Sequence, residues 1–440
     1  MKGLRLRFLG GVGEVGGNKI LLEYKGEKIF FDFGLSFSRK RMFYSEPFLA
    51  PRDEVSLMEL GLLPRLKGAY RFDEGEPEFS AVFLSHAHMD HAAYISFLKR
   101  EIPIYCGETS ALILRALGEI RGRSFEYDFS NLEFRTFRTG DKIRLGEVEV
   151  KPVHVDHSIP GAYGFIAYTP DGAVAYTGDF RLHGSRPDMT WDFVVEASKA
   201  EPSAFIVEGT NLVDGEVYSE AELVDSLKRL IGNIKGLVLA DFSLTDVDRF
   251  KSFLSVAEQT GRKLVLNLKH AYLLERLSSD PKLKLPSLKD DRILIYQKTK
   301  KRFARWEREI LDRYDTVGAG ELSAMQEKAI LALSFYSFSE LVDIKPTPGS
   351  CYILSSSEPV GEEAEIDYWR MLNWLEHYGL PQYRIHVSGH IMPLQTLQIL
   401  EEVKPRKVFP VHCERPALFK RFVEGSFKVE TPATDKGYEV

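Results

Sequence analysis

The chain has 440 residues, of which 44% are hydrophobic, and its formal net charge is −6. This length is too great for one ordinary hydrophobic core, so we expect two or more domains. The negative charge excludes a general electrostatic attraction to nucleic acid, and no apolar run approaches the roughly 18 residues that a membrane span requires. The three cysteines are widely spaced, which favours a reducing, cytoplasmic compartment over a disulfide framework.

Short strands with occasional helices are predicted for the first half of the chain. Alternating or continuous apolar runs indicate the strands, and runs with a longer period indicate the helices. The first strand alternates and continues directly into glycines, so it does not resemble a signal peptide. The predicted strands are 4–8, 19–24, 28–32, 80–85, 142–153, 163–168 and 173–177, and the predicted helices are 92–99 and 111–118.

From about residue 201, strands and helices alternate along the chain. This alternation predicts a parallel sheet flanked by helices. The predicted strands are 204–207, 236–240, 263–267, 351–354, 384–387 and 407–411, and the predicted helices are 220–230, 246–259, 271–277, 299–309, 364–377 and 393–402.

The predicted helix 299–309 lies in a basic segment that contains two aromatic residues, Phe303 and Trp306. Two interpretations stay open: the segment follows a nucleic-acid strand through charge and stacking, or it is a solvated helix face. The basic residues are Lys298, Lys300, Lys301, Arg302 and Arg305.

Four metal-competent side chains lie within the six residues His86-Ala-His-Met-Asp-His91. The motif follows a predicted buried strand, so its side chains emerge at the edge of a sheet. His86 and His88 alternate and therefore point to the same side of an extended backbone, whereas Asp90 and His91 begin the next helix. Imidazole suits zinc and related metals, and a carboxylate adds affinity for zinc, manganese or iron. The motif predicts a metal centre.

Three further candidate ligands stand at the ends of predicted strands: His157, Asp179 and His412. Gly178 lets the backbone approach other groups closely just before Asp179. Together with the histidine motif these residues provide ligands for two ions. We expect His86, His88 and His157 to bind one ion, Asp90, His91 and His412 to bind the other, and Asp179 to bridge them.

Three residues or segments near the predicted ligands have more than one interpretation. Asp32, at a strand end, is expected to accept the second N–H of a ligating histidine, although a turn role is also open. His154 is expected to be structural or to support the ligands. The segment 11–16, GVGEVG, matches the dinucleotide fingerprint, but a strand rather than a helix follows it. We therefore interpret it as a tight glycine loop near the site and reject nucleotide binding.

These motifs resemble a known family. The HAHMDH motif, the HSIPG sequence around His157 and the Thr-Gly-Asp ending at Asp179 resemble the metallo-β-lactamase fold. Later segments resemble its β-CASP nucleases, close to the RNase J group: Glu208 after a strand, Ser-Gly-His ending at His390, and Pro-Val-His ending at His412. The resemblance implies an α/β fold, a metallo-β-lactamase αββα sandwich formed by residues 1–212 and 381–440. It further implies an inserted β-CASP α/β parallel-sheet domain, residues 213–380.

The resemblance also implies a cytoplasmic ribonuclease that acts on single-stranded RNA and binds two divalent metal ions, zinc or, as an alternative, manganese. Histidine at the last motif favours RNA over DNA. Two ions that share Asp179 would activate a hydroxide for attack on phosphorus, with Asp90 as a ligand and catalytic residue. His390, oriented by Glu208, would protonate the departing 3′-oxygen. Phosphate would be held by Ser388 and the loop Ser355, Ser356 and Ser357. The family often dimerises, so a homodimer is a further expectation.

The direction of cleavage has two candidate interpretations. A 5′-to-3′ exonuclease of the RNase J type is our first expectation. An endoribonuclease of the cleavage-factor type is the alternative, because Glu208 stands where RNase J usually has aspartate and the Ser355 loop resembles the family's 5′-nucleotide pocket only in part. A small-molecule ester or thioester hydrolase has no use for a large inserted domain, and a non-catalytic RNA-binding paralogue would have lost ligands that are present here.

Overall fold

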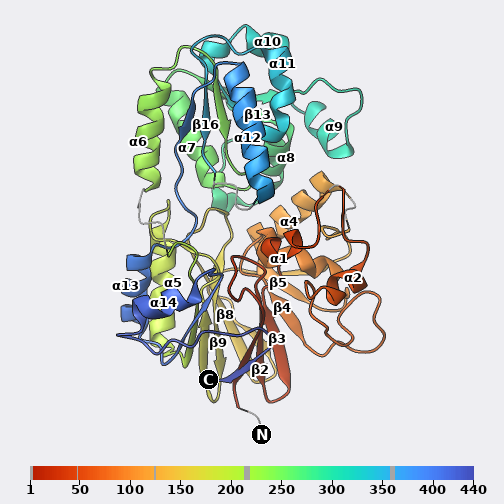
Figure 1. The fold of residues 1–440 in the computed structure, drawn as a ribbon, viewed down its shortest axis with the longest axis vertical. Helices are drawn as coiled ribbons and strands as arrows, with labels where there is room; N and C mark the ends of the chain where they lie inside the picture. The colour runs from red at the N-terminus through yellow and green to blue at the C-terminus, as the bar shows by residue number, and fades with distance from the viewer. Residues whose placement is uncertain (1–2, 47, 123–124, 213–218, 357–361) are drawn as a thin grey trace. The chain divides into compact units, whose positions relative to one another are not determined.

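The computed structural model describes residues 3–46, 48–122, 125–212, 219–356 and 362–440. The chain forms two compact units, the first made of residues 1–216 and 389–440 and the second of residues 217–388. The chain thus leaves the first unit once and later returns to it, which is the topology of an inserted domain (Figure 1).

Unit 1 is built on two sheets. The strands of the first sheet are β1 (Arg5–Gly10), β2 (Lys19–Tyr24), β3 (Glu27–Phe31), β4 (Ala81–Phe83), β5 (Ile104–Gly107), β6 (Phe134–Phe137) and β19 (Gly437–Glu439). Those of the second are β7 (Ile143–Leu145), β8 (Val148–His154), β9 (Tyr163–Thr169), β10 (Gly172–Tyr176), β11 (Ala204–Glu208) and β18 (Val408–Val411). The strand orders are β19-β1-β2-β3-β4-β5-β6 and β18-β11-β10-β9-β8-β7.

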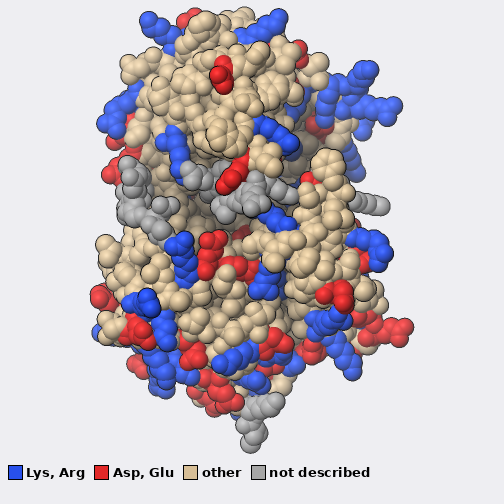
Figure 2. Space-filling view, viewed as in Figure 1, with Lys and Arg blue, Asp and Glu red and all other residues tan. Residues whose placement is uncertain are grey.

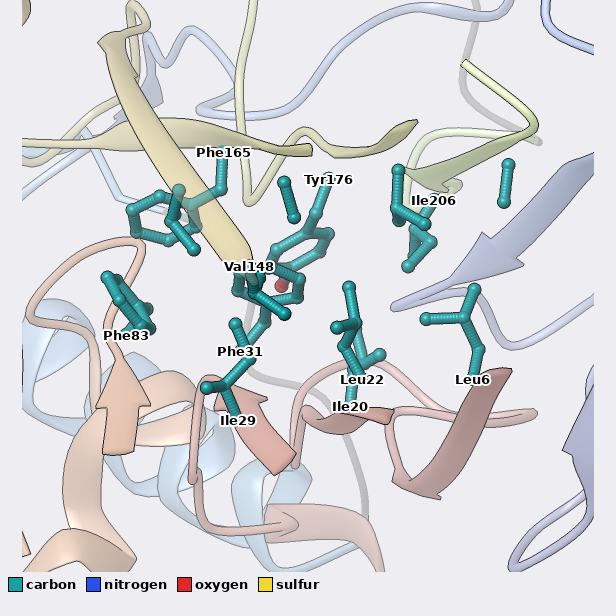
Figure 3. Packing of buried hydrophobic residues seen from close by; sticks show 14 of the residues in the cluster. Leu6, Ile20, Leu22, Ile29, Phe31, Phe83, Val148, Phe165, Tyr176 and Ile206 are labelled. Carbon is teal, nitrogen blue, oxygen red and sulfur yellow. The ribbon is translucent and has the colours of Figure 1, made fainter. Parts of the chain in front are cut away.

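Large apolar side chains fill the space between the two sheets of unit 1 (Figure 3). Phe31 of the first sheet stacks on Phe165 of the second, with ring centroids 5.4 Å apart. This packing explains the alternation of apolar and polar residues that predicts β1. Leu6 and Phe8 are buried, whereas Arg5 and Arg7 lie on the other, more exposed face of the strand. This burial fixes the register of the strand, since a shift by one residue would place the arginines in the core.

Helices cover the outer faces of both sheets in unit 1. α5 (Pro187–Lys199) contacts β8 and β9, and α13 (Pro393–Val403) packs beside it, while α4 (Glu108–Arg121) contacts β5 and β6 of the first sheet. α5, α13 and α14 gather on the outer side of the second sheet (Figure 1). The layers therefore form an αββα sandwich. The remaining helices are α1 (Phe37–Arg41), α2 (Glu54–Glu59), α3 (Met89–Ala92), the 3₁₀ helix η1 (Ala93–Phe97) and α14 (Pro416–Val423).

Unit 2 contains a six-stranded sheet whose neighbouring strands are all parallel. Its strands, in spatial order, are β14 (Ile293–Tyr296), β13 (Lys263–Asn267), β15 (Ala329–Ala332), β12 (Val238–Asp241), β16 (Cys351–Leu354) and β17 (Gln382–Arg384). The helices are α6 (Glu220–Ile231), α7 (Val247–Gln259), α8 (Leu268–Leu277), α9 (Arg305–Leu311), α10 (Ala319–Ser323), α11 (Leu341–Ile344) and α12 (Glu362–His377), with 3₁₀ helices η2 (Pro281–Leu283), η3 (Gln326–Lys328) and η4 (Phe335–Glu340). Within the described ranges, no helix combines the length and the apolar character needed to cross a membrane.

The structure corrects several predicted elements. The predicted helix 299–309 begins only at Arg305, where the Glu307 carboxylate accepts the backbone N–H of Ala304 and caps the helix. The predicted strand 142–153 is a hairpin of β7 and β8, because the chain turns at Gly146 with φ +56°. The predicted strand 384–387 lies at 382–384, where it pairs with β16. The predicted helix 92–99 is α3 followed by η1.

Candidate metal centre

Strand ends of unit 1 position the predicted ligands. β10, β11 and β18 are parallel neighbours, so their carboxyl ends meet at one edge of the second sheet. Asp179 follows β10, Glu208 ends β11 and His412 follows β18 at this edge. The histidine motif follows β4 of the first sheet, and His157 follows β8. Residues distant in the sequence are thereby gathered at one place.

Four of these side chains form the first group, whose ligand atoms all lie within 4.8 Å of one another: His86, His88, His157 and Asp179. Nδ1 of His88 lies 3.1 Å from Nε2 of His86 and 3.2 Å from Nε2 of His157. A single proton on Nδ1 of His88 can satisfy only one of these two contacts. Three imidazole nitrogens that converge at such distances are the donor set that a zinc-like ion prefers.

The second group contains Asp90, His91 and His412. Nε2 of His412 lies 3.1 Å from Oδ2 of Asp90, and Nε2 of His91 lies 3.9 Å from the same oxygen. A third group overlaps it and joins His412 with Asp179, Glu208 and His390.

Asp179 lies between the two histidine groups. Its Oδ2 is 3.7 Å from Nε2 of His86 in the first group, and 3.1 and 3.5 Å from Nε2 of His91 and His412 in the second. One carboxylate oxygen therefore faces both groups, which is the position that a bridging ligand requires.

The buried Asp32 orients the second group from behind. Its Oδ2 lies 2.7 Å from Nδ1 of His91, which leaves Nε2 of His91 pointing toward Asp179. Asp32 is itself held by Ser85, whose N–H and Oγ donate to its two oxygens, and by the hydroxyl of Tyr176 at 2.6 Å. Its backbone adopts φ +58°, a left-handed conformation that costs a non-glycine residue energy and persists where surrounding contacts impose it.

Two further histidines are oriented by their outer nitrogens. Nδ1 of His157 donates to the carbonyl oxygen of Gly389 at 2.6 Å, and Nδ1 of His412 lies 2.9 Å from Oγ1 of Thr210. Because Thr210 donates its own proton to Glu208, it accepts from His412. In both rings Nε2 therefore carries the lone pair and faces other members of the ligand groups: His88 and Asp179 for His157, and Asp90 for His412. Such outer hydrogen bonds fix tautomer and orientation in metal sites.

Buried polar atoms test whether the residues fit a metal ion. Nε2 of His91 and Oδ1 of Asp179 are buried and have no hydrogen-bond partner among the described residues. Buried groups of this kind are normally satisfied, because leaving one unpaired costs free energy. Both atoms belong to metal-competent groups, so a bound cation would satisfy them. The donor set and these unpaired atoms fit divalent metal ions.

The electrostatics of the site agree with this fit. Burial lowers the pKa of His86 and His157 well below the usual value and that of His88 to about 4, so these rings are neutral and able to ligate near neutral pH. The pKa of His91 is instead raised, because Asp179, Asp32 and Asp90 together outweigh the effect of burial. Carboxylates that attract a proton to His91 also attract a cation.

Glu208 and His390 form a hydrogen-bonded pair beside Asp179. Nδ1 of His390 lies 2.9 Å from Oε2 of Glu208 and 3.8 Å from Oδ2 of Asp179. Burial disfavours the charged ring, but Glu208 and Asp179 raise the pKa of His390 to about 9. Glu208 is buried, and its Oε1 accepts the backbone N–H of Phe180. The ring is thus held in its protonated form, with its side chain 22% exposed.

The glycine loop between β1 and β2 supports the centre. A strand follows it, and the segment contacts the ligands through its backbone: the N–H of His412 donates to the carbonyl of Gly11, and the N–H of Asn18 donates to that of Asp90. A Cβ on Gly16 would lie 2.6 Å from Cβ of Asp90. The glycines therefore permit close packing against the ligands.

The predicted phosphate-binding serines lie in unit 2. Ser355 is buried, and its hydroxyl donates to the carbonyl of Ile385 and accepts from Arg249. Ser356 and Ser388 are partly exposed, whereas Ser357 lies outside the described residues. The fully buried Arg249 also donates to the carbonyl of Ser355 at 2.8 Å, which holds the start of this loop.

Sequence reasoning missed the groups that hold the ligands from behind. Thr210 contacts Glu208, His390 and His412, and its place two residues after Glu208 was a signal. Two further residues that hold Asp32 could have been proposed from the sequence: Ser85, which directly precedes the histidine motif, and Tyr176, which ends β10. The role of the Gly389 carbonyl could not be predicted from the sequence, since every residue has a backbone carbonyl and the residue type does not show which one accepts from a histidine.

Comparison with known proteins agrees with this architecture. Residues 62–210 match the family model of the β-lactamase superfamily domain. Ribonuclease J of Thermus thermophilus is 26% identical over 92% of this chain and 67% of that protein, and ribonuclease J of Sinorhizobium meliloti is 27% identical over 92% and 68%. A solved structure of a protein of unknown function from Enterococcus faecalis V583 covers both chains fully, with a TM-score of 0.80 and 24% identity, and so shares the fold.

The comparisons agree with three features of the structure: the αββα sandwich, the inserted parallel-sheet unit and the converging metal-competent side chains. The chain is a metal-dependent hydrolase of the metallo-β-lactamase fold with an inserted α/β domain, and it is similar to ribonuclease J.

Proposed function

We propose that this protein is a ribonuclease that removes nucleotides from the 5′ end of single-stranded RNA. One observation carries the proposal: Asp179 belongs to the first group of metal ligands and lies 3.1 and 3.5 Å from His91 and His412 of the second, and the Glu208–His390 pair lies beside the same carboxylate. A hydrolase of phosphodiesters needs this combination, because it must stabilise negative charge and protonate a departing oxygen. The relatives named ribonuclease J support RNA as the substrate.

The proposal assigns two divalent ions to the centre. His86, His88 and His157 would hold one, Asp90, His91 and His412 the other, and Asp179 both. Bound ions of this kind supply Lewis acidity, which lowers the pKa of water and neutralises charge on phosphate oxygens. Zinc suits the histidine-rich first group, and manganese is the alternative because each group also contacts a carboxylate.

His390 is assigned as the general acid. Glu208 accepts from Nδ1 of His390, so the opposite nitrogen of the protonated ring remains the one that can deliver a proton. The raised pKa, about 9, keeps this proton on the ring at neutral pH. Transfer to the departing 3′-oxygen leaves a product with a 5′-phosphate, and Glu208 stabilises the ring in the geometry required.

In unit 2, Ser356 and Ser388 are the candidates for hydrogen bonds to phosphate, because both are partly exposed. Ser355 is assigned a supporting role in the same loop, since its hydroxyl already contacts Ile385 and Arg249. We further propose that the enzyme is cytoplasmic and forms a homodimer, as the resemblance to the family implies.

The alternative is an endoribonuclease of the cleavage-factor type. Glu208 favours it, because this glutamate occupies the position where the resemblance to RNase J leads us to expect aspartate. Both enzymes would use the same centre, so the position of the first cut distinguishes them.

The test is a time course on a 30-nucleotide single-stranded RNA with a labelled 5′-monophosphate, in parallel with a 3′-labelled copy and a matched DNA. Zinc and manganese are supplied separately. The His86→Ala/Asp90→Ala variant is the inactive control, and the His154→Ala variant is the matched active control because His154 belongs to none of the ligand groups.

We expect labelled mononucleotide from the first substrate at the earliest times. Discrete internal fragments from the 3′-labelled RNA would show that the enzyme is an endonuclease and not an exonuclease. Intact RNA in the presence of either metal would overturn the proposed function, and hydrolysis of thioesters would then be the next activity to test.

A further inference from the structure

We propose that unit 2 carries a surface that binds the phosphate backbone of single-stranded RNA, independently of the bases. We call it the basic edge, and it consists of Lys269, Lys298, Lys301, Arg302, Arg305 and Arg308. The inference rests on the proposed function and extends it, because it names residues of unit 2 that bind the substrate in addition to the metal centre of unit 1.

Sheet geometry gathers these residues. β13 and β14 are parallel neighbours in which Asn267 pairs with Tyr296, the last residue of each strand. Lys269 and Lys298 each follow two residues later, so both lie at the carboxyl edge of the same two strands. Ligands of open parallel sheets bind outside this edge. The segment from Lys298 then leads directly into α9, which carries Arg305 and Arg308.

The basic edge lacks carboxylate partners. None of its six residues has an ion pair among those found for the described part of unit 2, whereas Arg276 and Arg313, on the neighbouring α8 and just after α9, pair with carboxylates at 2.9 and 3.0 Å. Lys300, within the same segment, pairs with Glu307 and is not counted in the basic edge. In a chain of net charge −6, a group of six basic residues without such partners offers a place where an external anion can bind.

Lys269 and Lys298 show that positive charge is retained here at an energetic cost. Lys269 lies in the first turn of α8, which contains no acidic residue, although a helix N-terminus favours negative charge. The ammonium of Lys298 donates to Oγ of Ser337 at 2.8 Å. Burial, together with Lys269 and Lys300, lowers the pKa of Lys298 against the opposing effect of Glu340. A bound phosphate would relieve this repulsion.

The two aromatic residues of the segment already have partners within the protein. Trp306 is only 8% exposed and packs against Tyr272, and Lys300 lies over the ring of Phe303 with its ammonium 5.1 Å from the centroid. Burial thus removes Trp306 from contact with bases, and Lys300 already lies over the ring of Phe303. If the basic edge contacts RNA through charge alone, the binding affinity should depend strongly on salt and should not depend on the identity of the bases.

Lys and Arg side chains gather on the visible face of unit 2 where α9 lies (Figure 2). Lys301, Arg302 and Arg305 are exposed at this place, so their head groups can be changed without disturbing packing. They are the residues to substitute.

The experiment compares Lys301→Gln/Arg302→Gln/Arg305→Gln with a matched control, Lys228→Gln/Arg229→Gln/Lys235→Gln. The control removes the same charge from exposed residues of unit 2 that precede the opposite end of the sheet, since β12 begins three residues after Lys235. Fluorescence anisotropy measures the affinity for 5- and 30-nucleotide RNAs between 50 and 300 mM salt, in a His390→Ala background that prevents cleavage.

We expect the basic-edge variant to bind the 30-nucleotide RNA about tenfold or more weakly at 100 mM salt. The slope of log affinity against log salt should fall by about 2, because each lost single-strand phosphate contact removes about 0.7. The 5-nucleotide RNA and the control variant should behave as the wild type does. Single-stranded DNA should lose affinity by the same factor as RNA.

Unchanged affinity and slope for the long RNA would overturn the inference, as would an equal loss in the control variant. If wild-type protein binds RNA through the basic edge but cuts none, the proposed function fails while this surface stands. If it cuts RNA and the substitutions change neither KM nor affinity, only the basic edge fails.

Discussion

His154 and His157 lie three residues apart, yet only His157 joins a group of metal-competent side chains. The ring of His154 instead stacks on Tyr163 at 4.6 Å. We expect His157→Ala to lose one bound ion per chain and at least about a hundredfold in activity, because one ion loses a ligand. His154→Ala should retain both ions. Metal content measured by mass spectrometry decides the point, and equal stoichiometry in the two variants would contradict the assignment.

Replacing Glu208 by glutamine tests the acid pair through its pH dependence. The carboxylate raises the pKa of His390, which is about 9, so the acid form is present below that pH and is lost as the pH rises through it. Removing the negative charge lowers this pKa. We therefore expect the alkaline limb of the kcat profile of Glu208→Gln to move to lower pH, measured between pH 6 and 10. A uniform loss at every pH would indicate a structural role only.

The glycine loop makes a prediction at the scale of the element. Gly16 and Gly13 both have positive φ, +79° and +67°, so alanine strains the backbone at either position. Only at Gly16 would the new Cβ contact Asp90; at Gly13 it meets no atom within 4 Å. Gly16→Ala should reduce metal affinity or activity about tenfold or more relative to Gly13→Ala, since displacing a ligand has effects of this size. Equal activities would show that strain alone matters.

His270, near the start of α8, predicts how acid affects unit 2. The ring is buried with both nitrogens unpaired among the described residues, and burial lowers its pKa to about 4. Between pH 6.5 and 4 the unfolded chain binds a proton that the folded chain does not, so stability falls as the pH falls, by about 3 kcal/mol over this range. His270→Phe cannot take up this proton and should show a shallower decline. Urea unfolding at pH 4.5 and 7 measures the difference, and parallel declines would refute it.

Elements and ligands with local signals were predictable from the sequence. The histidine motif brings four metal-competent side chains together within six residues, alternation located β1, and short apolar runs located β2 and β3. Helix α5 was missed although its buried positions, Thr190, Phe193, Val194 and Ala197, follow helical spacing after Pro187. The extent of α9 was overestimated because a charged run carries no information about where Glu307 caps the helix. Orienting groups such as the Gly389 carbonyl depend on tertiary packing and leave no local pattern.

At the scale of the whole molecule, the metal ligands join segments from His86 to His412 within unit 1. Each bound ion stabilises the folded state by about 2.7 kcal/mol when free metal is a hundredfold above Kd. Removal of both ions by a chelator should therefore lower the melting temperature of unit 1 by about 10 °C, since the loss of each ion shifts a unit of this size by about 5 °C. Calorimetry with and without chelator tests this, with the His86→Ala/Asp90→Ala variant as the insensitive control. A transition unmoved by chelator in the wild type would argue against tight binding.

The division of ligands along the chain also sets an order of assembly during synthesis. The first group is complete once Asp179 has been made, whereas the second also requires His412, on the far side of the inserted unit. A growing chain thus contains all four ligands of the first group before the last ligand of the second exists. Since the proposed chemistry needs both sites and His390, the emerging polypeptide stays inactive toward the messenger that encodes it until the segment that follows unit 2 has been translated.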